Sequence, residues 1–398
     1  MQGKLRVAIV ISHPIQHFCP QYSSFAKNPL VHLKVFFASS LGYNKYLDPN
    51  FGQMISWNNL KLETFEHEFL NEGKNVPVGK TIDAPDLNNK LLDFKPDVVF
   101  IYGYFQKLQR RAYKWAHRNK VSLVYISDSE RNRDRKAYSE ILKYPYLYNY
   151  FSGITKFLTV GDANEAYYRF FRVPPKKFIR MHFPIDINLY ESAYKIKDEL
   201  RNRTRLQLRI KDEEIVLSVV GKLVEWKNQG DIIDAMINLE KENVYLHLFV
   251  LGSGEMIEDL KKKATRLLKS KVHFMGFLKP EELPSYYAST DIYIHPARLE
   301  PHSLAISEAI YMGCPVILSN KCGSFGFSDD VQESKNGFVF ECGNIKELAE
   351  FINCLSANEN LRKKFGEYSH SIAAQFQQNS HHNVLNKLIS VISHGQHI

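Results

Sequence analysis

Two lysines near the middle of the chain have the type and spacing expected of a site for a phosphorylated ligand. Lys222 and Lys227 lie five residues apart and follow an apolar run that ends at Val220. As point charges at a strand end they can bracket a diphosphate, and Gly221 lets the backbone turn close to such a ligand. A solvated basic turn would look the same, so the spacing alone leaves both interpretations open.

Two glutamates, Glu300 and Glu308, lie in a segment that follows the apolar run Asp291–His295. An offset of eight residues is about 80° around a helix, so the two carboxylates would not share a helix face. We therefore predict that Glu300 lies in a loop and Glu308 in the first turns of a helix. On an otherwise apolar helix Glu308 needs a partner, either a ligand hydroxyl or a neighbouring base.

Ser303 and Leu304 are predicted to begin that helix. Amides at a helix N-terminus lack partners within the helix and the helix dipole adds positive character, so this end favours a phosphate. A second strand-to-helix junction, Leu251-Gly252-Ser253-Gly254-Glu255, imitates a dinucleotide-binding fingerprint, but its third glycine is replaced by Ile257. We favour a tight turn there.

His13, Gln16 and His17 follow the first apolar run of the chain, Arg6–Ile11. Their side chains can hydrogen-bond the hydroxyls of an acceptor, and an imidazole can relay a proton near neutral pH. Asp128, which also follows an apolar run, is a similar candidate. Loop histidines are as often structural, so the functional interpretation depends on their position after a strand.

Short apolar runs alternate with stretches of helical spacing along most of the chain, which is typical of βαβ units and parallel sheets. The alternation stops near Phe183-Pro184-Ile185-Asp186, a charged helix-like segment spans Tyr190–Leu208, and the alternation resumes afterwards. Ligands bind beyond the carboxyl ends of parallel strands, so two such units would form a cleft where these ends face each other. The expected strands are Arg6–Ile11, Leu33–Phe37, Asp97–Tyr102, Ser122–Ile126, Phe157–Val160, Glu214–Val220, Val244–Leu251, Lys271–Met275, Asp291–His295, Pro315–Ser319 and Gly337–Phe340.

The charge of the chain is unevenly distributed. Its 398 residues are 44% apolar and 24% charged, which is globular composition and excludes a disordered or fibrous protein. Of the formal net charge of +9, residues 1–185 contribute 27 basic and 15 acidic side chains, and 186–398 contribute 25 and 28, giving +12 and −3. A basic half suggests a polyanionic partner: a nucleic acid, an anionic membrane surface or a phosphorylated small molecule.

The segment 105–136 carries much of this basic charge. It combines the cationic stretches Gln106–Lys120 and Arg131–Lys136, and an aromatic run, Tyr144–Phe151, follows. Such segments suit a peripheral contact with an anionic membrane, although a solvated helix face over an aromatic core would show the same pattern. No helix-turn-helix, zinc-finger or RNA-binding signature is present, so a basic nucleic-acid binder is the weakest interpretation.

The cysteines and the apolar runs indicate the cellular compartment expected for the protein. The five cysteines are odd in number and form no CxxC pair, which favours a reducing cytosol over a disulfide framework or a zinc site. No apolar stretch reaches the roughly 18 residues needed to span a bilayer, and the apolar run at the start is too short for a signal peptide. We expect a cytoplasmic protein, at the inner face of a membrane.

Seven short phrases follow one another in the second half of the chain: Gly221-Lys222-Leu223…Lys227, Leu251–Gly254, Phe274–Phe277, Asp291–Pro296, Glu300-x7-Glu308, Met312–Ile317 and Asn336–Phe340. Their order and spacing resemble the family-4 retaining glycosyltransferases, which have the GT-B fold. The resemblance is close over about 215–345, whereas the first half resembles the family only through its βαβ alternation and the phrase Pro96–Phe100.

The resemblance implies transfer of a sugar from a nucleotide-sugar in the C-terminal domain to an acceptor in the N-terminal domain, with retained anomeric configuration. Lys222 and Lys227 would contact the donor diphosphate, so fixed positive charge would replace a metal. Glu300 would bind the donor sugar, where a carboxylate stabilises an oxocarbenium-like centre. Glu308 would bind the ribose hydroxyls, and the backbone of Gly276–Leu278 would flank the base.

The chain departs from the family pattern at several positions. Asn228 replaces a common glycine, and His302-Ser303 replaces a common pair of an aromatic residue and glycine. Ser12–His17 stands where a glycine-rich loop is common. Tyr102-Gly103-Tyr104 stands where a histidine often follows the fourth strand, which leaves no family histidine assigned there.

We therefore predict an α/β protein of the GT-B fold with an acceptor domain over 1–185, a donor domain over 186–375 and a C-terminal helix over 376–398 that packs back on the first domain. We expect no metal or cofactor, a nucleotide-sugar (UDP-sugar as the commonest type) as donor, and a lipid-linked or polysaccharide intermediate as acceptor. A GT-B sugar-nucleotide 2-epimerase, which needs no acceptor, is the alternative. The candidate residues are Glu300 and His13 for catalysis; Gly221, Lys222, Lys227, Gly276, Phe277, Leu278, Ser303, Leu304 and Glu308 for the donor; and Gln16, His17 and Asp128 for the acceptor.

Overall fold

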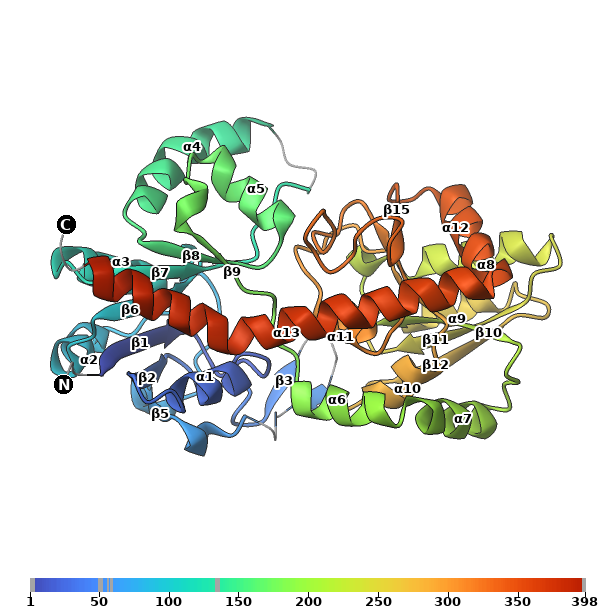
Figure 1. Ribbon diagram of the computed structural model, residues 1–398, viewed down its shortest axis with the longest axis horizontal. Helices are drawn as coiled ribbons and strands as arrows, with labels where there is room; N and C mark the ends of the chain where they lie inside the picture. Colours follow the sequence, from blue (N-terminus) through green and yellow to red (C-terminus); the bar gives the residue numbers. More distant parts are fainter. Residues whose placement is uncertain (1–3, 49–52, 56, 58–59, 133–136, 396–398) are drawn as a thin grey trace.

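The computed structural model describes residues 4–48, 53–55, 57, 60–132 and 137–395, which form two α/β units side by side (Figure 1). The first unit contains a seven-stranded sheet in the order β5-β2-β1-β6-β7-β8-β9, and the second a six-stranded sheet in the order β12-β11-β10-β13-β14-β15. Neighbouring strands in both sheets pair in parallel. Each sheet therefore gathers the carboxyl ends of its strands at one edge.

The elements follow one another with short connections. The strands of the first sheet are β1 (Leu5–Ile11), β2 (Val31–Phe37), β5 (Glu66–Phe69), β6 (Val98–Tyr102), β7 (Ser122–Ile126), β8 (Lys156–Thr159) and β9 (Phe178–Arg180). Those of the second are β10 (Ile215–Val220), β11 (Leu246–Leu251), β12 (Lys271–Gly276), β13 (Ile292–His295), β14 (Val316–Ser319) and β15 (Gly337–Phe340). The antiparallel pair β3 (Tyr46–Asp48) and β4 (Gln53–Ile55) stands apart.

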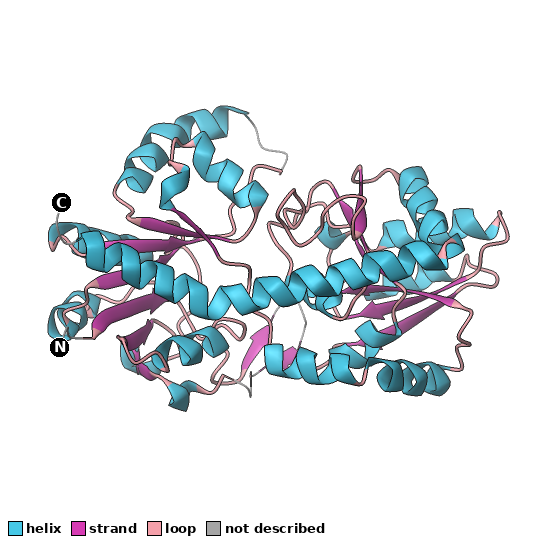
Figure 2. Ribbon diagram, in the orientation of Figure 1, coloured by secondary structure: helices cyan, strands magenta, loops and turns pink. Residues whose placement is uncertain are grey.

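Helices cover the faces of both sheets (Figure 2). In the first unit they are α1 (Cys19–Ala26), α2 (Leu87–Phe94), α3 (Lys107–Arg118), α4 (Ala137–Ser152) and α5 (Asp162–Phe170). The later ones are α6 (Ile187–Lys195), α7 (Lys197–Leu208), α8 (Gly230–Glu240), α9 (Ile257–Ala264), α10 (Leu283–Ser289), α11 (Leu304–Tyr311), α12 (Ile345–Ala357) and α13 (Glu359–Gly395). The described residues also form the 3-10 turns η1 (Leu62–Thr64), η2 (Asn71–Gly73), η3 (Pro175–Lys177) and η4 (Glu225–Lys227).

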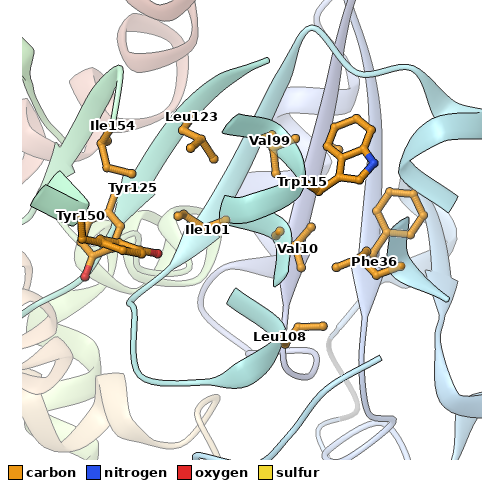
Figure 3. Packing of buried hydrophobic residues seen from close by; sticks show 14 of the residues in the cluster. Val10, Phe36, Val99, Ile101, Leu108, Trp115, Leu123, Tyr125, Tyr150 and Ile154 are labelled. Atoms are coloured by element: carbon orange, nitrogen blue, oxygen red, sulfur yellow. The ribbon is translucent and has the colours of Figure 1, made fainter. Parts of the chain in front are cut away.

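The core of the first unit has two layers, one on each face of its sheet. Side chains of a strand alternate between faces, so Val7 and Ile11 of β1 pack on one face and Ala8 and Val10 on the other. Helices α1 and α13 cover the first face, and α2, α3, α4 and α5 cover the second. Figure 3 shows the second layer, in which Trp115 of α3 lies over the strands. Burial on both faces explains why these strands are continuous apolar runs.

The two units are connected twice. The chain crosses between β9 and α6, and α13 returns along both units, with Phe365 in the core of the second and Leu385 in the core of the first (Figure 1). Where the two connections meet, the side chain of Gln377 donates to the carbonyl oxygen of Phe183 at 3.0 Å and accepts from the amide of Ile185 at 3.2 Å. This amide clamp joins α13 to the crossing segment.

Three features of the fold differ from the expected elements. The segment expected to be one helix is two, α6 and α7, because Ile196 between them leaves the helical conformation. Helix α13 begins at Glu359 and not at 376, since no proline interrupts the chain after that point and Gly366 allows close packing on the carbonyl of Gly313. Strands β3, β4, β5 and β9 were not expected from the sequence; β5 and β9 are short edge strands, without a long apolar run.

Candidate active site

Two adjoining cavities lie where the carboxyl ends of the two sheets approach each other. One, which we call the Glu308 cavity, has a volume of about 290 Å³, and the other, the Glu300 cavity, about 560 Å³. Both are lined by His17 from the first unit and by Gly221 and Leu304 from the second. Residues from both sheets therefore meet at one cleft, as the parallel topology predicts.

The backbone at the end of β10 forms a wall common to both cavities. Gly221, with φ of +143°, receives the close approach of Gly252, where a Cβ would overlap the carbonyl oxygen of Gly221. The amide of Gly252 in turn donates to the carbonyl oxygen of Gly276 at 2.8 Å. The glycines thus pack three neighbouring strand ends against one another, consistent with a structural turn after β11.

Glu300 is an ionised carboxylate in a nearly buried position. Its side chain forms an ion pair with Lys227 of η4, and Nε2 of His295 lies 3.2 Å from the same oxygen. Burial alone would raise the pKa of Glu300, but the hydrogen bond from His295 and the charge of Lys227 lower it to about 2. An ionised Glu300 only accepts, so His295 donates from Nε2 and its Nδ1 accepts from the hydroxyl of Tyr293 at 3.2 Å.

Glu308 has the opposite electrostatic state. It lies in α11, half-buried at the edge of the Glu308 cavity, and the hydroxyl of Tyr287 donates to it at 3.0 Å. Burial raises the pKa of Glu308 to about 7, and the hydroxyls of Tyr287 and Tyr190 only partly oppose that shift. The hydrogen-bond partner of Glu308 within the protein is thus a tyrosine, Tyr287, and not the neighbouring base considered from the sequence.

The candidates of the first unit divide into lining and non-lining residues. Gln16 and His17 line the Glu308 cavity, and His17 and Asp128 line the Glu300 cavity. Burial and the nearby His13 lower the pKa of His17 to about 4, so its ring is neutral at pH 7. His13 itself lines neither cavity, and its Nδ1 lies 2.9 Å from the hydroxyl of Ser12.

Most of the donor candidates line one of the two cavities. Phe277, Leu278 and Glu308 line the Glu308 cavity, and Lys227 and Ser303 line the Glu300 cavity.

Three donor candidates differ from expectation. Lys222 and Gly276 are absent from the described lining of both cavities, and Gly276 supports the wall through its carbonyl. The amide of Ser303, expected to be available to a phosphate, donates to the hydroxyl of Ser324 at 2.9 Å.

A buried polar cluster beside the Glu300 cavity was missed in the sequence. His302 lines that cavity, and its Nε2 lies 3.3 Å from a carboxylate oxygen of Asp330. Burial alone would lower the pKa of His302, but Asp330 reverses this and raises it. Asp330 also accepts from the hydroxyl of Ser307 at 2.7 Å and faces His182 at 3.5 Å. His302, which departs from the family pattern within the Glu300-x7-Glu308 phrase, was the available signal, but its partner Asp330 lies 28 residues away in the sequence.

The comparisons with known proteins agree with this arrangement. Residues 201–371 match the family described as "Glycosyl transferases group 1". These residues, which we call the group 1 segment, are similar in sequence to that family. The segment contains β10 to β15 and the cavity-lining residues Lys227, Glu300 and Glu308.

Curated relatives match this chain over part of their length. The spore coat protein SA of Bacillus subtilis is 27% identical over 195 residues, 46% of this chain and 51% of that protein. The alpha-monoglucosyldiacylglycerol synthase of Acholeplasma laidlawii is 25% identical over 193 residues, 46% and 47% of the two chains. The chain spans about half the length of the curated relatives it matches.

Solved structures match the whole chain. Anabaena HepE in complex with UDP has a TM-score of 0.69 at 19% identity and covers 98% of this chain and 99% of that one. WaaG, a glycosyltransferase involved in lipopolysaccharide biosynthesis, has a TM-score of 0.64 at 18% identity and covers 98% and 100%. The fold is therefore GT-B, as the resemblance in the second half predicted, and it extends over the first half as well.

Proposed function

We propose that this protein is a retaining glycosyltransferase that moves a sugar from a nucleotide-sugar to an acceptor. One observation carries the proposal: Glu300 with Lys227, and Glu308, all within the group 1 segment, face His17 and Asp128 of the first unit across one cleft. In the proposed arrangement the nucleoside occupies the Glu308 cavity, and the donor sugar and acceptor meet in the Glu300 cavity.

The proposed reaction exchanges one bond at the anomeric carbon. The bond from this carbon to the diphosphate oxygen breaks, and its electron pair leaves with the nucleoside diphosphate. The acceptor hydroxyl oxygen forms the new bond, and its proton is transferred to the released nucleotide. Lys227 would offset the charge that develops on the diphosphate, and ionised Glu300 would stabilise positive charge at the anomeric carbon.

A uridine nucleotide is the proposed donor type. HepE has been solved in complex with UDP-glucose as well as with UDP, which supports the choice at the level of shared fold. A thermal-shift panel of nucleotide-sugars tests it, because a ligand that binds only the folded protein raises the melting temperature. We expect UDP-sugars to raise it most, and a larger shift with a guanosine or adenosine nucleotide-sugar would contradict the donor type.

Replacement of the two paired residues tests the site. We expect Glu300→Ala and Lys227→Ala to abolish transfer while circular dichroism and thermal unfolding indicate an intact fold. Glu225→Ala is the matched control, because Glu225 is exposed in the same short turn as Lys227 and lines neither cavity. Full activity in both site variants would overturn the assignment.

An incubation with donor alone separates the proposed transferase from a 2-epimerase of the same architecture. A transferase leaves the sugar nucleotide unchanged or hydrolyses it slowly, whereas an epimerase converts it to its epimer without an acceptor. The two outcomes are distinguished by NMR of the sugar signals. Epimer formation at a rate comparable to catalysis would replace the transferase proposal.

We also propose a peripheral contact with an anionic membrane through α3 and α4. Apolar side chains are unusually exposed here, 58% for Phe105, 71% for Ile141 and 76% for Leu142, and the α3 residues Lys107 and Lys114 are exposed as well. Tyr113 of α3 stacks on Tyr150 of α4 at 4.1 Å, so the two helices are in contact.

This combination of exposed apolar and basic side chains matches the interface of anionic lipid. Among the described helices, none is both long and apolar enough to cross a membrane. Arg133–Lys136, part of the segment 105–136 expected to contact lipid, lie outside the described residues.

Liposome binding tests the membrane contact. The double variant Ile141→Ser/Leu142→Ser should lose most of its binding to vesicles containing anionic phosphatidylglycerol at low salt. Leu268→Ser is the matched control, because Leu268 is 90% exposed on the other unit. Unchanged binding in the double variant, or absence of binding by the wild type, would contradict the proposed surface.

A further inference from the structure

Three side chains of the types that bind metals converge in the buried polar cluster beside the Glu300 cavity. Nδ1 of His182 and carboxylate oxygens of Asp329 and Asp330 all lie within 4.8 Å of one another. His182 belongs to the crossing segment after β9, and the two aspartates lie in the loop between β14 and β15. Imidazole nitrogen and carboxylate oxygen are both ligands of zinc, so the group has the composition of a metal site.

These three residues are buried, and a ring nitrogen of one of them has no hydrogen-bond partner. His182 is 5% exposed, and Asp329 and Asp330 are 0% and 1% exposed. Nδ1 of His182 makes no hydrogen bond. A carboxylate oxygen of Asp330 faces it at 3.5 Å, which is longer than a normal N–H···O bond. A buried polar atom without a partner costs free energy, and a cation between the ring and the carboxylates would satisfy it.

The spacing of the facing atoms suits a shared ion. Zinc binds imidazole nitrogen and carboxylate oxygen at about 2.0–2.2 Å, so two ligand atoms of one tetrahedral zinc ion lie about 3.4 Å apart. The 3.5 Å between Nδ1 of His182 and Oδ1 of Asp330 is close to this value. A divalent cation would also balance the charges of the two carboxylates while the imidazole stays neutral, which is the state that binds metal.

Hydrogen bonds from outside the group hold both carboxylates in place. The two oxygens of Asp329 accept from the amide of Asp162 at 2.7 Å and from the amide of Asp330 at 2.9 Å. Oδ2 of Asp330 accepts from the hydroxyl of Ser307 at 2.7 Å. A carboxylate oxygen can accept more than one bond, so these contacts leave capacity for a metal. Such outer hydrogen bonds are typical of the surroundings of metal ligands.

The neighbouring rings and cations are compatible with this arrangement. The ring of His182 stacks on Phe376 of α13 with centroids 3.7 Å apart, which fixes its orientation. Arg180, two residues before His182, pairs with Asp162 at 2.6 Å and with Glu165 at 2.9 Å, so other carboxylates engage its charge. His302 lies beside the second oxygen of Asp330 at 3.3 Å and orients that carboxylate from outside the group.

We propose that His182, Asp329 and Asp330 form a site for a divalent transition-metal ion, with zinc as the ion that this ligand set suits. The site is distinct from the donor and acceptor sites and does not depend on the transferase function. Its ion would join the crossing segment to the second unit, and the amide of Asp162 extends the connection to α5 of the first. The ion would thus fix the relative position of the two walls of the cleft. It was not expected from the sequence, because His182 is far from the two aspartates along the chain.

Zinc titration tests the site. Full-length protein is freed of metal with EDTA, dialysed and titrated with zinc chloride by isothermal titration calorimetry. We expect one bound zinc per chain, and His182→Gln and Asp329→Asn should each weaken its binding at least about tenfold, because a ligand is lost. His370→Gln is the matched control, because His370 also stacks on an aromatic ring, that of Tyr194, and lies outside the group. No zinc binding by the wild type, or equal binding by all variants, would overturn the proposal.

X-ray absorption at the zinc edge tests the ligands without any variant. Wild-type protein loaded with one equivalent of zinc should show nitrogen and oxygen ligands, with the outer-shell scattering of an imidazole and no sulfur. The chain has five cysteines, so an adventitious zinc site would be expected to include sulfur. A sulfur ligand, or the absence of imidazole, would place the ion elsewhere and overturn the proposal.

Thermal unfolding distinguishes zinc from a hard cation. Zinc well above its Kd should raise the Tm of the wild type, because it binds the folded protein, and this rise should be lost in His182→Gln. Magnesium at the same concentration should leave Tm unchanged, since it prefers oxygen ligands and imidazole is a poor one. An equal rise with magnesium, or a rise with zinc that persists in His182→Gln, would contradict the role given to the imidazole.

Discussion

The Glu300 and Glu308 cavities use the same residue type in opposite ionisation states. Glu300 lies beside Lys227 and a donating histidine, and its pKa is lowered to about 2, whereas Glu308 is half-buried against tyrosine hydroxyls and its pKa is raised to about 7. The two carboxyls are eight residues apart in one segment. A lysine and a donating imidazole thus keep one carboxylate ionised despite burial, and tyrosine hydroxyls are too weak to do so for the other.

This difference suits two different tasks. An ionised carboxylate with a fixed cation can stabilise charge that develops during a reaction. A carboxyl that is half protonated near pH 7 can accept from a ligand hydroxyl after losing its proton, so its ionisation can be coupled to binding. Three measurements test this difference between the two cavities.

The largest expected effect is on turnover. Glu300→Gln should lower kcat by about 10²–10³-fold, because an electrostatic interaction at the reacting centre is removed. Glu308→Gln should keep kcat within about tenfold of the wild type and act mainly on the KM of the donor, since glutamine resembles the protonated carboxyl. Steady-state kinetics with a saturating acceptor measure both, and an equal loss of kcat in the two variants would remove the distinction between the cavities.

The next effect is on the pH dependence of stability. The pKa of Glu308 in the folded protein, about 7, lies above its ordinary value of 4.5. The contribution of this carboxyl to the free energy of unfolding is therefore fully present below about pH 4.5 and is lost as the pH rises through 7. At about 1.4 kcal/mol per pKa unit the loss is on the order of 3 kcal/mol. Urea unfolding from pH 5 to 8 should therefore show the wild type losing stability relative to Glu308→Gln.

For Glu300 the pH dependence of stability has the opposite sign and falls in a different pH range. Its folded pKa of about 2 lies below 4.5, so its contribution is present above about pH 4.5 and is lost as the pH falls toward 2. Between pH 5 and 8 the stability difference between wild type and Glu300→Gln should stay constant. A difference that grows with pH for Glu300→Gln, or stays flat for Glu308→Gln, would contradict the assigned states.

The smallest expected effect is the release of a fraction of a proton when UDP binds. If ribose hydroxyls donate to Glu308, UDP binding lowers its pKa and releases about half a proton at pH 7, where the free carboxyl is about half protonated. Calorimetry of UDP binding in buffers of different ionisation enthalpy measures this release. Glu308→Gln should abolish it, and Glu300→Gln should retain it; a release that persists in Glu308→Gln would place the titrating group elsewhere.

Much of the fold could be predicted from the sequence, because most strands are buried on both faces. The expected Ser122–Ile126 and Gly337–Phe340 coincide with β7 and β15, and the other expected strands agree within two residues at each end. The edge strand β5, with the sequence Glu-His-Glu-Phe, was missed because its side chains are half exposed and carry no apolar run. Edge strands are defined by pairing with a distant neighbour, which local pattern does not contain.

The candidate site was predictable in part. The loop position of Glu300 and the helical position of Glu308 followed from their spacing, and both are confirmed. His13 looked equivalent to His17, but only His17 lines the cavities. Which of two loop histidines faces the cleft depends on how the loop packs, and this could not be read from residue types.

The sequence alone was enough to predict the alternating α/β pattern, most of the strands and the motifs at the strand ends, because these depend on local periodicity and on neighbours a few residues apart. Only the tertiary structure decided the charge states, since the partners that set them are distant in the chain. Lys227 and Glu300 are separated by 73 positions, and Tyr287 and Glu308 by 21. A pKa depends on burial and on charges within a few ångströms, and these distances exist only after η4, α10, α11 and the end of β13 have packed together in the second unit.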